Sequence, residues 1–411
     1  MGVPRVWVIS ELYYPEDTST GYFLTKIAEG LAERYPVNVL CGQPTYSARA
    51  ARALWSELYR GVEIRRCWST TLNKDFLPFR VLNMMTLSVS VFLRALWSLG
   101  RGDLVLVVTN PPLLPFLIMA AGRLRQTRVL LLIHDVYPEV LIAAKVTRAG
   151  SLPSRALNCL NRWLYRSADQ VIVLGRDMYE LVMAKLGKGQ PPVIIPNWAD
   201  TDEIRPVPRD GNSFLGKLDL MRKFVVLYSG NMGRTHGLQD IVECAQRLIS
   251  APEVHFLLIG SGAGHRWLKE TLRARELHNV SLLDRQPREQ LNNALNAGDV
   301  AIISFLPGMA GVSVPSRMYN LMAAGKAIIA VADTNSELAM VIREEGIGWV
   351  VTPGDNAELH ATILAAKSAP ERLAEMGRRA RRVAEEKYSF SVVIGAYHSL
   401  IERVSHAESR V

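Results

Sequence analysis

The chain alternates short apolar runs with longer segments in which apolar residues recur with the period of a helix. Gly21–Tyr35 shows that period, with Phe23, Ile27 and Leu31 on one face and charged residues elsewhere. The apolar runs are rich in Val, Ile and Leu, as expected for strands buried on both faces. In the first half they are Val6–Ser10, Val37–Cys41, Leu104–Thr109, Val129–His134, Val171–Leu174 and Val193–Pro196. This order predicts a parallel sheet covered by helices.

A second series follows residues 200–219, a stretch of Pro, Gly and charged residues that predicts an interdomain linker. Its expected strands are Val225–Ser229, His255–Ile259, Val280–Leu283, Val300–Ser304, Ala327–Val331 and Trp349–Thr352. Its expected helices include Gln239–Ile249, Arg266–Glu276, Glu289–Leu295 and Ser316–Ala324. The pattern predicts an α/β protein with two doubly wound, Rossmann-like domains. Ligands of such domains bind at the carboxyl ends of the strands, so we expect the site in a cleft between them.

Composition narrows the class of protein and of partner. The 411 residues are 49% hydrophobic and 21% charged, with a mean hydropathy of +0.08. These values exclude a disordered chain and a polytopic membrane protein. The net charge of +9 favours nucleic acid, phosphorylated small molecules or an anionic membrane surface. No nucleic-acid-binding signature accompanies it, and we interpret the basic segment Glu371–Lys387 as a solvated helix face. We therefore expect no nucleic-acid partner.

The cysteines and the first residues indicate a cytoplasmic protein. Cys41, Cys67, Cys159 and Cys244 are far apart and form no metal-binding motif, so we expect buried free thiols and no metal. The N-terminal segment lacks the long apolar core and the cleavage site of a signal peptide.

One uncharged apolar segment, Val81–Leu93, lies between Arg80 and Arg94. As a helix it would rise about 20 Å, which is too short for a hydrocarbon core of about 30 Å. Two interpretations remain open. The segment is a core helix of the first domain, or it is an exposed apolar edge with flanking arginines that lies on an anionic membrane surface.

The strongest local motif is Ser229–Gly237, which follows an expected strand and precedes an expected helix. Glycines there let a ligand approach the backbone, and Arg234 offers a permanent charge for a diphosphate. The alternative is a structural turn with a surface arginine. We predict a phosphate-binding loop whose other candidate residues are Gly230, Asn231, Gly233 and His236.

Further polar groups fall at strand ends. His134 and Asp135 end an apolar strand, so one of them is a candidate catalytic group, although Asp135 could instead cap the next helix. Gly21, in the turn after the first strand, would let the backbone approach a phosphate or a sugar. The segment Ser313–Asn320 predicts a helix start that Ser316 could cap and that would suit an anion. We interpret Asp200-Thr201-Asp202 as polar linker residues with a local cap rather than as a metal site.

Several of these motifs together resemble family 4 glycosyltransferases, which have the GT-B fold, over nearly the whole chain. The carriers are Pro196–Asp202, Gly230–Arg234, Val314–Tyr319, Ala323–Lys326, Asp135–Glu139 and Gly348–Asp355. The resemblance is to the branch that builds bacterial polysaccharides and O-antigens, including N-acetylfucosamine transferases. It implies an N-terminal acceptor-side domain over 1–199, a linker over 200–219 and a nucleotide-sugar-binding domain over 220–388. It also implies a last helix, 389–411, that crosses back to the first domain.

The resemblance further implies a retaining, metal-independent transfer from a nucleoside-diphosphate sugar, with UDP as the expected nucleotide and no cofactor. Arg234 would neutralise the leaving diphosphate, and His134 or Asp135 would lie at the sugar and the acceptor. The implied donor-binding residues are Gly21, Gly230, Asn231, Gly233, His236, Ser313, Val314, Ser316 and Asn320. Relatives often carry two glutamates eight residues apart where this chain has Val312 and Asn320, and a lysine where it has His236.

The expected acceptor is a polyprenyl-diphosphate-linked sugar or another glycan, and the apolar segment near residue 85 would then place the protein peripherally on the inner face of the membrane. Two alternatives stay open. A UDP-sugar 2-epimerase would share the architecture but need acid and base carboxylates and no acceptor. A non-catalytic scaffold would bind the nucleotide sugar without turnover.

Overall fold

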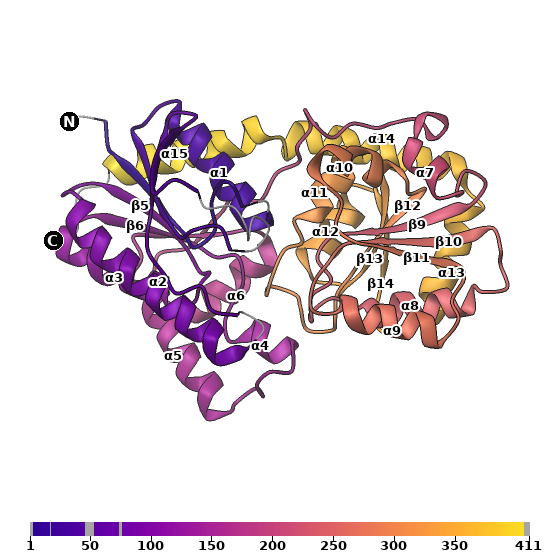
Figure 1. Ribbon diagram of the computed structural model, residues 1–411, viewed down its shortest axis with the longest axis horizontal. Coiled ribbons are helices and arrows are strands. Elements are labelled where there is room, and N and C mark those ends of the chain that lie inside the picture. The colour runs from indigo at the N-terminus through magenta and orange to yellow at the C-terminus, as the bar shows by residue number, and fades with distance from the viewer. Residues whose placement is uncertain (1–2, 17, 46–52, 74–75, 407–411) are drawn as a thin grey trace.

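The computed structural model describes residues 3–16, 18–45, 53–73 and 76–406, which form two α/β domains side by side (Figure 1). The sheet of the first domain has the strand order β3-β4-β2-β1-β5-β6-β7-β8. The strands are β1 (Val6–Ile9), β2 (Val37–Cys41), β3 (Ser56–Tyr59), β4 (Val62–Arg66), β5 (Leu104–Val108), β6 (Arg128–Leu132), β7 (Gln170–Val173) and β8 (Val193–Ile194). All neighbours are parallel except β3, which pairs antiparallel with β4. The expected parallel sheet is therefore present, and β3 and β4 extend it at one edge.

Helices pack around this sheet, and most of them bury an apolar face. They are α1 (Ser19–Ala32), α2 (Leu77–Ser98), α3 (Leu114–Arg125), α4 (Glu139–Ala143), α5 (Leu152–Ser167) and α6 (Arg176–Leu186). In Figure 1, α2, α3 and α5 lie along one side of the domain, and α2 contacts α3, which contacts α5.

The second domain has a parallel sheet with the order β11-β10-β9-β12-β13-β14. Strands are added on one side of β9 up to β11 and on its other side from β12 onward, so the strand order reverses between β9 and β12. The strands are β9 (Phe224–Ser229), β10 (Val254–Ile259), β11 (Val280–Leu283), β12 (Val300–Ser304), β13 (Ala327–Val331) and β14 (Gly348–Val351). The helices are α8 (Leu238–Arg247), α9 (His265–Ala274), α10 (Arg288–Asn296), α11 (Arg317–Ala323), α12 (Glu337–Glu344), α13 (Asn356–Lys367) and α14 (Pro370–Lys387). This order is that of a doubly wound domain, with its ligand crevice at the reversal point.

The chain passes between the domains at two adjacent places. Ala199 pairs with Ser389 in a parallel bridge, and its N–H donates to the carbonyl of Tyr388 at 2.6 Å. After the second crossing, α15 (Phe390–His406) packs on α1 of the first domain (Figure 1). Trp198, which is 2% exposed, packs edge to face on Phe390. The two crossing segments therefore lie side by side.

The linker is more ordered than its composition suggests. Residues Arg209–Gly211 form a 3-10 turn and Ser213–Lys217 form α7, which Asn212 caps through its side chain. Phe214 and Leu215 are buried, so this part of the linker packs onto the second domain.

Two expectations about side chains are wrong. Cys159 is exposed on α5, whereas the other three cysteines are buried. Arg381 does not lie on a solvated face, because its guanidinium donates to the carbonyls of Thr201, Ile204 and Ala323. It therefore holds the linker against the end of α11.

The helix α2 is longer than the uncharged run suggested, because Arg80 and Arg94 lie within it. Its Leu87, Val91 and Ala95 are buried, so one face belongs to the core. The opposite face is apolar and exposed. In the described part of the chain, Pro78–Ser98 is a helix long and apolar enough to cross a membrane, and 28% of its apolar window is buried.

Candidate active site between the domains

The segments that follow β6 and β12 meet between the domains. Asp135, which follows β6, forms a bridge with Ser313, and the N–H of Val136 donates to the carbonyl of Val312 at 3.0 Å. Nearby, the hydroxyl groups of Ser19 and Ser316 are 2.9 Å apart. The fold therefore brings together predicted residues of the first domain with those of the segment 313–320.

His134 and Asp135 lie at this junction. Burial lowers the pKa of His134 to about 4, so its imidazole is neutral at pH 7. Its Nε2 atom is shielded from solvent and has no hydrogen-bond partner in the described part of the chain. Burial raises the pKa of Asp135, and a hydrogen bond with Ser313 partly offsets that rise. Asp135 does not cap α4, whose first turn begins at Pro138 without a side-chain cap.

The loop after β9 is built on glycines that leave no room for side chains. Gly230 has φ +144°, and a Cβ atom there would lie 3.1 Å from the guanidinium carbon of Arg317. Gly260, with φ +155°, would place a Cβ atom 1.9 Å from the carbonyl oxygen of Gly230. The Gly233 N–H donates to Nδ1 of His236 at 2.8 Å. Close backbone packing thus fixes the predicted phosphate-binding loop.

The two arginines near this loop differ in their placement. Arg234 is exposed, and within the described residues it has no hydrogen-bond or ion-pair partner. Arg317, the first residue of α11, lies against the loop, and its Nη2 donates to the carbonyl of Asn231 at 3.0 Å. Our sequence reasoning gave Arg317 no role. The sequence does place a cation at the start of the helix that follows residues 313–316, and this position could have indicated an anion-binding role for Arg317.

The remaining predicted donor residues have mixed surroundings. Ser316 does not cap α11, because its hydroxyl contacts Ser19 instead. Val314 is buried against Gly175 of the first domain, and Val312 is also buried. The side chain of Asn320 is half-buried and has no hydrogen-bond partner in the part of the chain that is described. A Cβ atom on Gly21 would lie 2.7 Å from the carbonyl of Glu16, so this glycine also serves its own turn.

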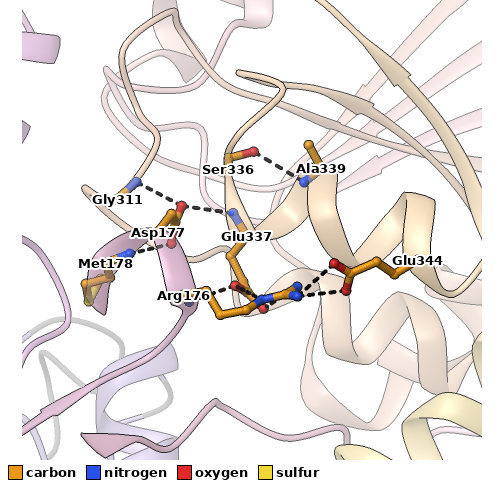
Figure 2. A network of polar contacts seen from close by, with 8 residues as sticks. All are labelled: Arg176, Asp177, Met178, Gly311, Ser336, Glu337, Ala339 and Glu344. Carbon is orange, nitrogen blue, oxygen red and sulfur yellow. Dashed lines mark hydrogen bonds and ion pairs between the residues drawn. The ribbon is translucent and has the colours of Figure 1, made fainter. Parts of the chain in front are cut away.

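Figure 2 shows a polar network that joins the two domains. One carboxylate oxygen of Asp177 accepts from the N–H groups of Gly311 and Glu337 at 2.8 and 2.9 Å. Beside it, Arg176 of α6 donates to Glu337 at 3.0 Å and to Glu344 at 2.8 Å. These contacts join α6 to the loop before α11 and to α12. The sequence gave no signal for them, because the partners are more than 130 residues apart.

Asp200 joins both domains to the linker. Its Oδ2 atom accepts from the Tyr22 hydroxyl at 2.6 Å and from Arg288 at 2.7 Å. Its Oδ1 atom accepts from the N–H of Glu203, which is the expected local cap. Burial, followed by the charge of Asp200, raises the pKa of Tyr22. The carboxylate is therefore occupied by protein donors.

A polar pocket lies within the first domain at the ends of β1 and β2. Glu11, Gln43, Thr70 and Asn83 line it, together with Leu87 of α2. The Oε1 atom of Gln43 is buried without a hydrogen-bond partner among the described residues. The amide, hydroxyl and carboxylate groups of the pocket suit hydrogen bonds with a single hydroxyl group of a ligand.

Two Rossmann-like domains that face a cleft, with a C-terminal helix returning to the first domain, are the architecture of the GT-B fold. Residues 20–198 match the glycosyl transferase 4-like domain, and residues 216–383 match the glycosyl transferases group 1 family. The chain belongs to this family and is a glycosyltransferase of bacterial polysaccharide biosynthesis.

Named relatives have the same extent as this chain. The probable glycosyltransferase WbjE of Pseudomonas aeruginosa is 33% identical over 396 residues, which cover 94% of each chain. The putative colanic acid biosynthesis glycosyl transferase WcaI of Escherichia coli K12 is 25% identical and covers 89% of this chain and 93% of its own. The structure of Anabaena HepE with UDP and glucose has a TM-score of 0.73 at 15% identity, and it covers 97% of this chain and 100% of its own. The predicted family and GT-B fold are confirmed.

Proposed function

We propose that this protein transfers a sugar from a UDP-sugar to a lipid-linked acceptor at the cytoplasmic face of the cell membrane, during assembly of a surface polysaccharide such as an O-antigen. One observation carries the proposal. The outer face of α2, α3 and α5 combines exposed apolar side chains with arginines and contains no acidic residue. An acceptor that is free in solution would give no reason for such a face.

The apolar part of this face is a stripe on α2. Its members are spaced four residues apart, so they lie on one side of the helix, and Trp97 is 87% exposed. They are Val81, Met85, Val89, Leu93 and Trp97. An exposed stripe of this kind is typical of helices that lie in the interface of a bilayer.

The charge of the same face suits anionic lipid. The helices α2, α3 and α5 carry two, two and three arginines, respectively, without an aspartate or glutamate. On α5, Trp163 stacks with Phe116 and lies 5.0 Å from the guanidinium carbon of Arg123. Each basic residue near an anionic surface contributes about 1 kcal/mol to membrane binding.

The inner side of α2 supports the acceptor part of the proposal. Asn83 and Leu87 form one wall of the polar pocket, while Met85 and Val89 on the same helix face solvent. We propose that a lipid-linked acceptor keeps its lipid in the bilayer and places its sugar beside this pocket, with a hydroxyl group directed into it.

The donor part rests on the cleft. The HepE structure contains UDP in the same fold, and the glycine loop 230–237 offers a place for its diphosphate. We propose that Arg234 adds a solvent-screened charge there. Tyr22 and Arg288 both donate to the carboxylate of Asp200, so this side chain is engaged by the protein and not free to bind a metal. That arrangement supports metal-independent transfer. Retention of configuration is proposed from the resemblance to family 4 enzymes.

Binding to vesicles tests the membrane part. We expect the wild-type protein to sediment with vesicles that contain phosphatidylglycerol and to remain in solution with pure phosphatidylcholine. Leu93→Glu together with Trp97→Glu should weaken binding about tenfold or more, because apolar burial is lost and two negative charges are added. Trp267→Glu, on an exposed tryptophan of α9, is the matched control and should bind normally. Wild-type protein that does not sediment with anionic vesicles would contradict the proposal.

Turnover tests the chemistry. We expect UDP release from one UDP-sugar of a panel only when a lipid extract with lipid-linked acceptors is added, and we expect it to continue in EDTA. NMR of the product should show the anomeric configuration of the donor. Release without acceptor, loss of activity in EDTA, or an inverted product would each refute the corresponding part.

A further inference from the structure

Arg317 extends from the start of α11 across the glycine loop. Its guanidinium carbon lies 4.7 Å from the ring centre of Tyr228, so the charge is stacked on an aromatic face. The missing side chain of Gly230 makes room for it, since a Cβ atom there would approach the guanidinium to 3.1 Å. The side chain is therefore held in the predicted phosphate-binding loop.

The charge of Arg317 is not balanced by the protein. Among the residues that the structure describes, no carboxylate pairs with it, and its Nη1 atom is shielded from solvent without an acceptor. Arg317 is half-buried, and a guanidinium that is partly removed from water is commonly paired with an anion. The loop therefore holds a cation that lacks its counter-ion.

His236 shows the same shortage of acceptors. Its Nδ1 faces the N–H of Gly233 at 2.8 Å, and its Nε2 faces Nη2 of Arg317 at 3.0 Å. A neutral imidazole has one acceptor nitrogen, so these two contacts cannot both be hydrogen bonds. Burial and the charge of Arg317 lower the pKa of His236 well below its ordinary value. An anion beside Arg317 would draw the guanidinium away and leave Nε2–H of His236 free to donate to the same anion.

We infer that Arg317 is the principal cation for the diphosphate of the donor, with Nε2–H of His236 as a second donor. This inference rests on the proposed UDP-sugar function. In the transfer, the bond between the anomeric carbon and the β-phosphate oxygen breaks and its electron pair stays on UDP. The acceptor oxygen bonds to the anomeric carbon, and its proton passes to a phosphate oxygen. The planar fork of Arg317 suits the two oxygens on which this charge develops.

Calorimetric binding of UDP and of uridine tests the assignment, with Arg317→Gln, Arg317→Lys and Arg234→Gln as variants. Arg317→Gln should lower the affinity for UDP at least about tenfold and should change the affinity for uridine by less than about twofold. Arg317→Lys should be intermediate, because a point charge replaces a fork. Arg234→Gln should lower the affinity for UDP by less than about threefold, since the charge of Arg234 is exposed to solvent.

Thermal unfolding without ligand separates this role from a structural one. Arg317 has no carboxylate partner among the described residues and makes only a hydrogen bond to Asn231 and a stacking contact with Tyr228, so Arg317→Gln should lower the unfolding temperature by no more than about 4 °C. A larger fall in unfolding temperature would overturn the inference, as would UDP affinity that depends on Arg234 and not on Arg317. Wild-type protein that binds no UDP would overturn the proposed donor and the inference together.

Discussion

The polar network in Figure 2, which joins the two domains through Asp177 and Arg176, allows a quantitative prediction about domain motion. Asp177→Ala removes the two hydrogen bonds that one carboxylate oxygen accepts from Gly311 and Glu337 across the cleft. Hydrogen bonds to a charged group contribute about 1.5 kcal/mol each, so the closed form should lose about 3 kcal/mol. That energy corresponds to a shift of about 100-fold between closed and open forms. Water can hydrate both N–H groups once the domains separate, so the open form loses little.

Small-angle X-ray scattering without ligand measures this shift. We expect the radius of gyration of Asp177→Ala to exceed that of the wild type, and kcat/KM for the donor to fall because closure no longer accompanies binding. The matched control is Asp103→Ala, since one oxygen of Asp103 also accepts two bonds, from Trp7 and Gly100 at 2.8 Å each, but within the first domain. It should lower the unfolding temperature without opening the cleft. Identical scattering and kinetics for Asp177→Ala and the wild type would refute the reasoning.

Three further outcomes are expected. Arg176→Ala should shift the same equilibrium by about 1 kcal/mol at low salt and by less at high salt, because the guanidinium is 42% exposed; equal scattering shifts at both salt concentrations would contradict this. The unfolded chain binds more protons than the folded chain between pH 6.5 and the pKa of about 4 of His134, so stability falls as pH decreases through that window. His134→Asn should remove about 1.4 kcal/mol of the loss between pH 7.5 and 5.5, measured by urea unfolding at both pH values. Gly260→Ala should abolish UDP binding because its Cβ atom meets backbone, whereas Gly216→Ala in α7 meets no atom within 4 Å and should bind UDP normally in the same calorimetric assay.

Much of the fold was predictable because its strands are parallel and buried on both faces. Such strands are continuous apolar runs, and Val37–Cys41, Val280–Leu283, Val300–Ser304 and Ala327–Val331 have the predicted bounds. The hairpin β3–β4 was missed because β3, at the edge of the sheet, alternates exposed and half-buried residues of mixed polarity.

The candidate site was predictable where chemistry follows a strand directly. The loop 230–237 and the pair His134–Asp135 both lie where strand ends face the cleft. Arg317 was missed, because its relation to Gly230 and His236 depends on how α11 packs beside the loop. The roles of the individual residues remain predictions.

The sequence by itself determined the two parallel sheets and the loops at the strand ends, because local hydrophobic period and glycine placement fix these features within short segments. Only the tertiary structure decided which of the long-range partners meet. Asp177 reaches Gly311 and Asp200 reaches both Tyr22 and Arg288 through packing of whole domains. The same packing buries one face of α2 and exposes the other, although both are apolar. Whether an apolar surface is buried depends on which distant segment packs against it, and a local sequence pattern carries no information about that segment.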